Sequence, residues 1–468
     1  MIASPATTPT GSIWDTRYLA LTVGSILAVT IAAFQGLAVA TIAPVLADDI
    51  GGRDLYGWIF TAFILPQIIG TVIGGLEVDR RQPAIVFYTS LAFFAVGCAV
   101  AGSAPSIFVL FLGRALQGFG AGAMFACVYA IISAVYEDHL RPAMLAAMSS
   151  AWIIPSLIGP GIAGFIADHV GWRYVFWGLI PILAIVAPLT WPAFRGVRME
   201  HDIAAANANA RRVPYAVALA FGTGLFLAGL DVRPVALGAP IAAAGLAILV
   251  PMLKRLLPAG TFVARPMLGG ALSSRALCFG GFAVIETYMV FSLKEFGGAS
   301  TSTAGLVLTL GSLTWSFGSI LQARLDRNRG PASRPRRVRG GVSIMLAGTA
   351  LIFGMVALFS DIWLPVTIAG WLTAGLGIGL AYPTAATIAF AHAPRGQDGL
   401  VSSSTLLGDL FTSSVGVGLG GVVLALGLNR DWGAPASAGT AMVLGVAMLM
   451  LAWLAAQRLV LARAAGTQ

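Results

Sequence analysis

Long runs of uncharged residues, separated by short polar turns, follow one another along the chain from Tyr18 onward. A charge at the centre of a lipid bilayer costs at least ~2.5 kcal/mol, whereas a charge in a turn meets water, so uncharged runs of about 20 residues mark membrane-spanning helices. Dividing these runs at turns rich in Gly, Pro or Ser predicts fourteen spans. The predicted spans lie near residues 18–46, 55–76, 83–102, 106–135, 143–167, 174–194, 213–230, 234–253, 268–293, 301–323, 340–360, 363–392, 400–427 and 438–457.

Similar polar turns follow the second and the tenth predicted spans, around Asp79 and Asp326. The two aspartates are 247 residues apart, whereas six helices at about 33 residues each would separate them by roughly 200. The difference corresponds to one additional helical pair. We therefore expect an all-α integral membrane fold of two six-helix bundles, residues 1–194 and 268–468, joined by a linker with two extra transmembrane helices, residues 195–267. Two similar helical halves around a midplane site are typical of alternating-access transporters.

The composition agrees with a chain that lies almost entirely within a membrane. Of the 468 residues, 58% are hydrophobic and 10% are charged, which excludes a soluble enzyme and leaves no room for a large water-soluble domain. The formal net charge of +9 resides in short turns between apolar runs. Because these turns form no aromatic-rich basic face, they favour anionic membrane lipids over nucleic acid as partners.

The distribution of basic residues predicts the orientation. If alternate loops face opposite sides, 22 of the 28 Lys and Arg residues fall on one side, five fall on the other, and Arg114 lies inside a span. Loops rich in Lys and Arg stay in the cytoplasm. We expect a multi-pass protein of the plasma (cytoplasmic) membrane with both termini in the cytoplasm.

Two motifs lie in the fourth and fifth predicted spans. The fourth span matches L-x-x-x-R-x-x-Q-G-x-G-A from Leu110 to Ala121, and the fifth matches much of G-x-x-x-G-P-x-x-G-G through Gly159, Pro160 and Gly164. These motifs resemble the major facilitator superfamily and, within it, the fourteen-span drug:proton antiporters. The resemblance implies a major facilitator fold, a monomer that moves small amphipathic substrates, no cofactor, and protons as the coupling ion.

Two further segments resemble the same subfamily in part. The turn after the second span shares Gly75, Asp79 and Arg80 with the motif G-x-L-a-D-R-x-G-R-[RK] but has other residues at its remaining positions. In the first span only the closing Pro44 of L-D-x-T-[IV]-V-N-x-A-[LM]-P is present, and Gln35 occupies the position of the aspartate. The usual acidic residue of the first span is therefore missing.

Three charged residues inside the predicted spans stand out as candidate sites: Arg114, Glu286 and Asp409. Intramembrane charges are costly and mark pathways for ions or substrates. Glu286 lies near midspan, where a carboxyl group can take up a proton near neutral pH, and its alternative role is that of a buried acid permanently paired with a neighbour. Asp409 is expected to be a second proton or cation site, or merely to bond the surrounding hydroxyl groups. By the resemblance Arg114 assists proton transfer, and its alternative role is bonding to backbone carbonyls of another helix.

Polar and aromatic residues near the middle of the spans are expected to line a central substrate cavity. They are Gln35, Gln67, Trp152, Tyr288, Trp315 and Tyr382. A second set is expected to form the gates between the two halves. It comprises Gly75, Asp79, Arg80, Gly159, Pro160, Gly164, Asp326 and Arg327. The alternatives are aromatic core packing, close helix packing at the glycines, and ordinary cytoplasmic turns.

These observations favour a secondary active transporter that exports lipophilic, and by its acidic residues cationic, drugs or other amphipathic compounds in exchange for protons. A P-loop for ATP is absent from the sequence, and its four histidines form no metal-ligand spacing. The same fold can export a lipid or a specific metabolite. A membrane subunit of a proton-pumping redox complex is a further alternative, although Lys254 and Lys294 lie at span ends rather than inside the membrane.

Overall fold

The computed structural model consists of α-helices and short connecting turns throughout the part of the chain that it describes. The structure describes residues 12–137, 140, 144, 147–148, 151–197, 210, 212–232, 234–359, 362–393 and 398–466. Within these residues, thirteen helical segments are long and apolar enough to cross a membrane. The predicted all-helical membrane fold is confirmed.

The first half of the chain supplies six of the helical segments predicted to span the membrane. They are α1 (Thr16–Asp49), α2 (Tyr56–Arg80, preceded by the short η1, Arg53–Leu55), α3 (Pro83–Gly102), α4 (Ile107–Val135), α6 (Ile153–His169), and α7 (Arg173–Trp177) with α8 (Leu179–Arg195). Helix α4 packs on α2 and α3, while α1 packs on α6 and α8. We call this group the N-terminal half. Part of the predicted span 143–167 lies outside the described residues, and α6 accounts for the remainder.

The last part of the chain supplies six further helices, which we call the C-terminal half. They are α12 (Leu268–Glu295), α13 (Thr301–Arg329), α14 (Arg334–Phe359, preceded by η2, Pro331–Ser333), α15 (Leu364–Ala391), α16 (Asp398–Leu428) and α17 (Ala434–Gly466). Helix α12 packs on α15, α16 and α17, and α15 also packs on α13 and α14. Helices α13 and α17 run beyond their predicted ends at residues 323 and 457, since a helix that leaves the bilayer keeps its internal hydrogen bonds and places its charged turns in water.

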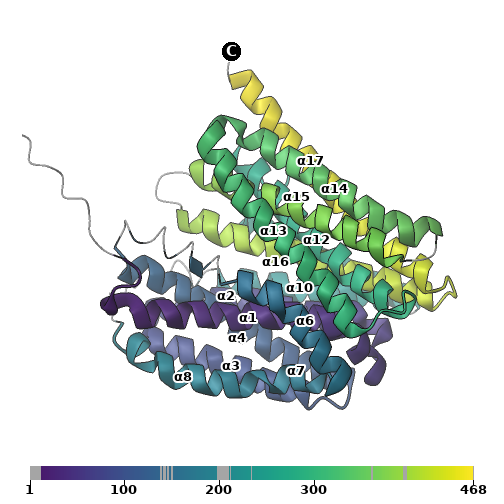
Figure 1. Cartoon of the computed structure of the whole chain (residues 1–468), viewed down its shortest axis with the longest axis horizontal. Helices are drawn as coiled ribbons and strands as arrows, with labels where there is room; N and C mark the ends of the chain where they lie inside the picture. Colours follow the sequence, from purple (N-terminus) through teal and green to yellow (C-terminus); the bar gives the residue numbers. More distant parts are fainter. Residues whose placement is uncertain are drawn as a thin grey trace, which may run out of the picture.

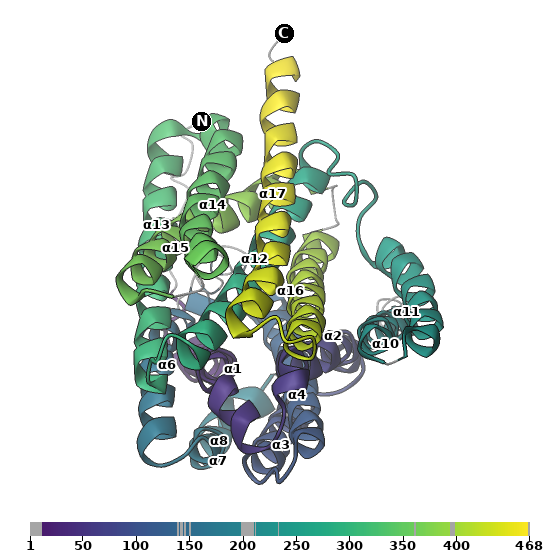
Figure 2. The same ribbon diagram turned by 90° about the vertical axis from the view of Figure 1, so that its right-hand side faces the viewer.

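Two helices between the halves form a hairpin at the side of the molecule. Helices α10 (Val213–Asp231) and α11 (Val235–Leu256) pack against each other, and α10 also contacts α2 and α16. Figure 2 shows the hairpin beside these two helices. The predicted extra pair at 213–230 and 234–253 therefore forms a helical hairpin, and its helix α10 contacts both halves.

The two halves lie against each other along one seam and diverge toward the end that carries the C-terminus. In Figure 1 the N-terminal half, purple to blue, lies below the C-terminal half, green to yellow. The inter-half contacts are made by α6 with α13, α2 with α16, and α1 with α12 and α13.

Candidate functional site

Polar contacts join the two halves at one end of the molecule. Nη1 of Arg53, before α2, donates to Oε1 of Glu295 at the end of α12 over 2.9 Å. At the end of α6, a carboxylate oxygen of Asp168 accepts hydrogen bonds from the backbone N–H of Ser302 at 2.8 Å and from its hydroxyl group at 2.7 Å. The other oxygen accepts from the N–H of Thr301. Asp168 thus caps the N-terminus of α13 from the opposite half, where a negative charge is stabilised by the helix dipole.

Glycines let the backbones of the two halves approach at the same end. A Cβ atom on Gly57 of α2 would lie 2.9 Å from the Cα of Gly421 in α16. A Cβ on Gly164 of α6 would lie 2.7 Å from the Cα of Ser302 in α13. Pro160 lies against Gly305 one turn farther along the same contact. Two of the predicted gate residues, Pro160 and Gly164, therefore lie at an inter-half seal, whereas Gly159 faces the ring of Phe34 within the N-terminal half.

The opposite end has a different arrangement. Asp326 at the end of α13 accepts hydrogen bonds from Arg334 at 2.8 and 2.9 Å and from Arg337 at 3.0 Å, all within the C-terminal half. Arg80 and Arg327 are exposed. The side chain of Asp79 lies outside the described residues, and Gly75 has open space where a Cβ would be. Among the described side chains, no ion pair joins the two halves at this end.

One face of α12 carries charged and aromatic side chains. Arg275, Phe279, Phe282 and Glu286 are spaced by three or four residues, so they form a single stripe along the helix. Arg275 lies within α12, two turns from its first residue. Sequence reasoning counted it as a residue of the cytoplasmic side, although its position in the predicted span 268–293 and its spacing from Glu286 could have identified it.

Arg275 and Asp409 form a buried ion pair with Tyr382. Nη2 of Arg275 is 2.9 Å from Oδ2 of Asp409, and the hydroxyl group of Tyr382 donates to the same oxygen over 2.6 Å. The guanidinium group of Arg275 also lies 3.6 Å from the centre of the Tyr382 ring. Oδ1 of Asp409 and Nε of Arg275 have no hydrogen-bond partner among the described atoms. Asp409 is thus paired rather than an isolated charge, while one of its oxygens stays available.

Aromatic rings surround this ion pair. Trp315 of α13 packs edge-on against Tyr382 at 5.8 Å and against Phe282 at 5.3 Å between ring centroids. Phe279 of α12 lies 5.7 Å from Tyr382. From the other half, Tyr129 of α4 lies near Arg275 with its ring exposed. The structure therefore brings the predicted residues Trp315, Tyr382 and Asp409 together in one cluster, and it adds Tyr129, which sequence reasoning missed.

Glu286 lies on the same stripe as the ion pair but apart from it. It is eleven residues beyond Arg275, which corresponds to about 16 Å along the helix. Its side chain is partly exposed, and no described residue forms an ion pair or hydrogen bond with it.

Arg114 lies between helices of the N-terminal half. Its Nε donates to the carbonyl of Ile59 over 3.2 Å, its Nη1 donates to Oε1 of Gln117 over 3.0 Å, and its guanidinium group lies 4.4 Å from the centre of the Phe63 ring. The side chain is 2% exposed. These contacts match the alternative role, bonding between helices, and place Arg114 outside the Arg275 cluster.

The remaining predicted cavity residues occupy varied environments. Gln35 is fully buried, and neither its amide nitrogen nor its oxygen has a described partner. Gln67 is buried in α2, and Trp152 precedes α6 with half of its ring exposed. Tyr288 is fully buried, and its hydroxyl group donates to the carbonyl of Val417 over 2.5 Å. Tyr288 therefore joins α12 to α16 rather than facing the Arg275 cluster.

The described residues contain no group of three His, Cys, Asp or Glu side chains that could hold a metal ion. The sequence profile of the Major Facilitator Superfamily matches residues 25–409. The chain belongs to the Major Facilitator Superfamily. It is accordingly a multi-pass transporter and not an enzyme.

Similar proteins of this superfamily include named drug transporters. The chain is 24% identical to a probable multidrug-efflux transporter of Mycobacterium tuberculosis, over 87% of this chain and 88% of that protein. It is 26% identical to the multidrug transporter protein MdtP of Bacillus subtilis, over 88% of this chain and 76% of that protein. The family predicted from the sequence motifs is confirmed.

Solved structures share the fold at lower sequence identity. A D-xylose-proton symporter matches with a TM-score of 0.66 and 14% identity, covering 94% of this chain and 97% of that one. The human organic anion transporter MFSD10 matches with a TM-score of 0.60 and 15% identity, covering 93% and 99%. These similarities establish the architecture of a major facilitator transporter.

Proposed function

We propose that this major facilitator transporter is a monomeric, proton-coupled exporter of lipophilic compounds in the plasma membrane. The observation that carries the proposal is Glu286, a carboxyl group without a described partner on the same helix stripe as the aromatic cluster. The naming of two bacterial relatives as multidrug transporters supports export of drugs. Intramembrane acids of this kind are typical of proton relays in transporters.

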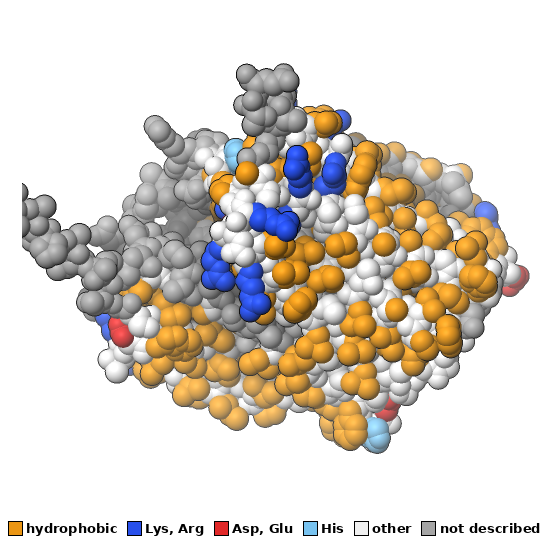
Figure 3. All heavy atoms as spheres, turned by 45° about the horizontal axis from the view of Figure 1, so that its top comes forward, with side chains coloured by type: hydrophobic (Ala, Val, Ile, Leu, Met, Phe, Trp, Pro, Cys, Tyr) orange, Lys and Arg blue, Asp and Glu red, His pale blue; other side chains and the backbone are white. Residues whose placement is uncertain are grey.

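In this proposal the sealed end faces the outside and both termini face the cytoplasm. The excess of Lys and Arg in the loops at the diverging end supports this orientation. Figure 3 shows basic side chains gathered at one part of a surface that is otherwise largely apolar. The conformation is then inward-facing, with the substrate approaching the Arg275 cluster from the cytoplasm or the inner leaflet.

The charges of the cluster determine which compounds are favoured. Asp409 is compensated by Arg275 at 2.9 Å, so the pair contributes little net field. Glu286 alone supplies an uncompensated negative charge, which favours lipophilic cations when it is ionised. Uptake of a proton by Glu286 removes that attraction, and this change couples release of the substrate to proton binding.

Replacement of Glu286 by Gln in proteoliposomes tests the coupling. The amide keeps the shape of a protonated carboxyl group but cannot release a proton, so we expect efflux driven by a pH gradient to be lost while substrate exchange without a gradient persists. Asp431→Asn, an exposed acid in the turn between α16 and α17 that takes no part in the seal or the Arg275 cluster, is the control and should retain gradient-driven efflux. Full gradient-driven transport by Glu286→Gln would refute proton coupling through Glu286 and would direct attention to Asp409.

A second candidate function is export of organic acids or acidic lipids. The buried guanidinium group of Arg275, with a free Nε, favours it because a substrate carboxylate could compete with Asp409 for this group. Competition among matched cationic, neutral and anionic dyes for efflux distinguishes the two. A preference for anions that disappears in Arg275→Gln would support acid export and would contradict export of cations.

A further inference from the structure

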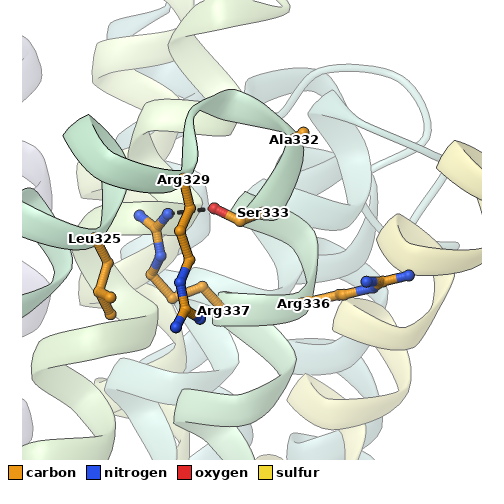
Figure 4. A pocket seen from close by; sticks show the side chains of 6 residues that line it. All are labelled: Leu325, Arg329, Ala332, Ser333, Arg336 and Arg337. Atoms are coloured by element: carbon orange, nitrogen blue, oxygen red, sulfur yellow. Dashed lines mark hydrogen bonds between the residues drawn. The ribbon is translucent and has the colours of Figure 1, made fainter.

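The turn between α13 and α14 borders a cavity that is open at the surface, and three of its six lining residues are arginines. The cavity measures about 380 Å³ and is lined by Leu325, Arg329, Ala332, Ser333, Arg336 and Arg337. Figure 4 shows the side chains of Arg329 and Arg337 within the turn, with Arg337 bonded to Ser333, whereas the guanidinium group of Arg336 extends away from them. This cavity is separate from the Arg275 cluster and has no part in the proposed export.

The positive charge of this turn is mostly uncompensated. Residues 324–339 contain seven arginines and a single acid, Asp326. That carboxylate is already engaged by Arg334 and Arg337. Among the described residues, the guanidinium group of Arg329 has no ion-pair or hydrogen-bond partner. A pocket with an unpaired guanidinium group favours a phosphate group, which guanidinium donors bind with two parallel hydrogen bonds.

The surroundings favour a phosphate that carries lipid chains. Leu325 and Ala332 provide apolar wall beside the arginines. Toward the middle of α13, Phe317 and Ile320 are 59% and 53% exposed, as expected for side chains that face lipid. Helices α13 and α14 both pack on α15 rather than along each other.

We propose that this cavity binds the headgroup of an anionic phospholipid. The phosphate is held by Arg329, with Arg337 adding positive charge, and the acyl chains follow the apolar surface of α13. Basic pockets between transmembrane helices on the cytoplasmic side suit such headgroups. The bound lipid would hold together the α13–α14 turn that Asp326 already fixes.

Binding to the purified full-length transporter in a neutral detergent tests the proposal. The probes are phosphatidylglycerol, phosphatidylcholine with the same acyl chains, and inorganic phosphate, each titrated against intrinsic fluorescence or bound-lipid mass. We expect phosphatidylglycerol to bind more tightly than the other two. Arg329→Gln should weaken its binding about tenfold, the amount that corresponds to loss of one charge-assisted hydrogen bond. The matched control is Arg324→Gln, an exposed arginine of the same helix end that does not line the cavity.

A second variant distinguishes binding in the cavity from general attraction of the lipid by the surface charge. Ala332→Trp fills the cavity while keeping every arginine, and because residue 332 is exposed, the fold should tolerate it. We expect it to weaken binding of phosphatidylglycerol as Arg329→Gln does. Wild-type affinity in both variants, an equal loss in Arg324→Gln, or inorganic phosphate binding as tightly as phosphatidylglycerol would each overturn the proposal. The last result would indicate a site for a free anion.

Discussion

The ion pair between Arg275 and Asp409 shows how a buried charge is retained inside an apolar bundle. Each ion would be costly to bury alone, and here the pair shares a phenolic hydroxyl group and an aromatic face of Tyr382. Removing one partner of such a pair leaves the other uncompensated, which costs more than removing both.

This argument predicts the stability of variants of the pair. Asp409→Asn should destabilise the transporter by about 3–5 kcal/mol because Arg275 stays charged and buried. The double variant Arg275→Gln/Asp409→Asn should be more stable than Asp409→Asn. Thermal unfolding in detergent measures both, and a double variant less stable than Asp409→Asn would show that the charges do not act as a pair.

The sequence predicts most residues of this cluster but not the contacts among them. Asp409, Trp315 and Tyr382 stood out because polar and large aromatic residues are rare within spans. Arg275 was assigned to a loop because hydropathy locates a helix better than its ends. Tyr288 and Trp315 are both aromatic residues near the middle of predicted spans. In the structure the hydroxyl group of Tyr288 donates to the carbonyl of Val417, whereas the ring of Trp315 packs against Tyr382. Helical phase relative to neighbouring helices decides this difference, and a single sequence does not contain it.

At the scale of elements, the seal between α6 and α13 combines close packing with a cap. The Cβ of any residue larger than glycine at position 164 would lie 2.7 Å from the backbone of Ser302. Backbone atoms cannot move aside as a flexible side chain can, so the helices must separate.

We therefore expect Gly164→Ala to shift the transporter toward states open at this end. Spin labels at residues 54 and 299, which lie in opposite halves near the seal, should report longer distances than in the parent protein. Gly75→Ala is the matched control, since a Cβ there meets no atom within 4 Å, and it should leave the distances unchanged. Identical distance distributions for Gly164→Ala and the parent would contradict a sealing role for this contact.

The cap from Asp168 makes a second prediction for the same seal. Asp168→Ala removes three hydrogen bonds to the start of α13, whereas Asp168→Asn keeps an acceptor oxygen but loses the charge. Loss of such a cap costs about 1 kcal/mol, so the closed-to-open ratio at this end should fall severalfold in Asp168→Ala and less in Asp168→Asn. The same pair of spin labels measures both, and unchanged populations in Asp168→Ala would exclude the cap as a stabilising contact.

At the scale of the whole molecule, the sequence predicted the helical architecture well. Uncharged runs of membrane length and the related turns at Asp79 and Asp326 were sufficient for the spans and the repeated pattern. The inter-half contacts could not be predicted, because they join residues more than 130 positions apart, as Asp168 and Ser302 do. The predicted gate residue Asp326 is an example. It was expected to contact the other half, but it pairs with Arg334 and Arg337 of its own half.

The proposed orientation predicts where each end is accessible. A cysteine replacing Pro331 should be protected from an impermeant thiol reagent added outside intact cells, whereas a cysteine replacing Asp54 should react. Labelling of everted membrane vesicles should give the reverse pattern. Reaction of the Pro331 cysteine in intact cells would invert the orientation.

The α10–α11 hairpin divides its contacts unequally between the halves. The indole N–H of Trp58 in α2 donates to Asp231 at the end of α10 over 2.8 Å, whereas the contact of α10 with α16 brings apolar groups together, such as Leu227 against Gly418. A hydrogen bond fixes two helices in one register, while a smooth apolar contact allows them to slide. If the halves rock against each other during transport, we therefore expect the hairpin to move with the N-terminal half while α16 slides along it.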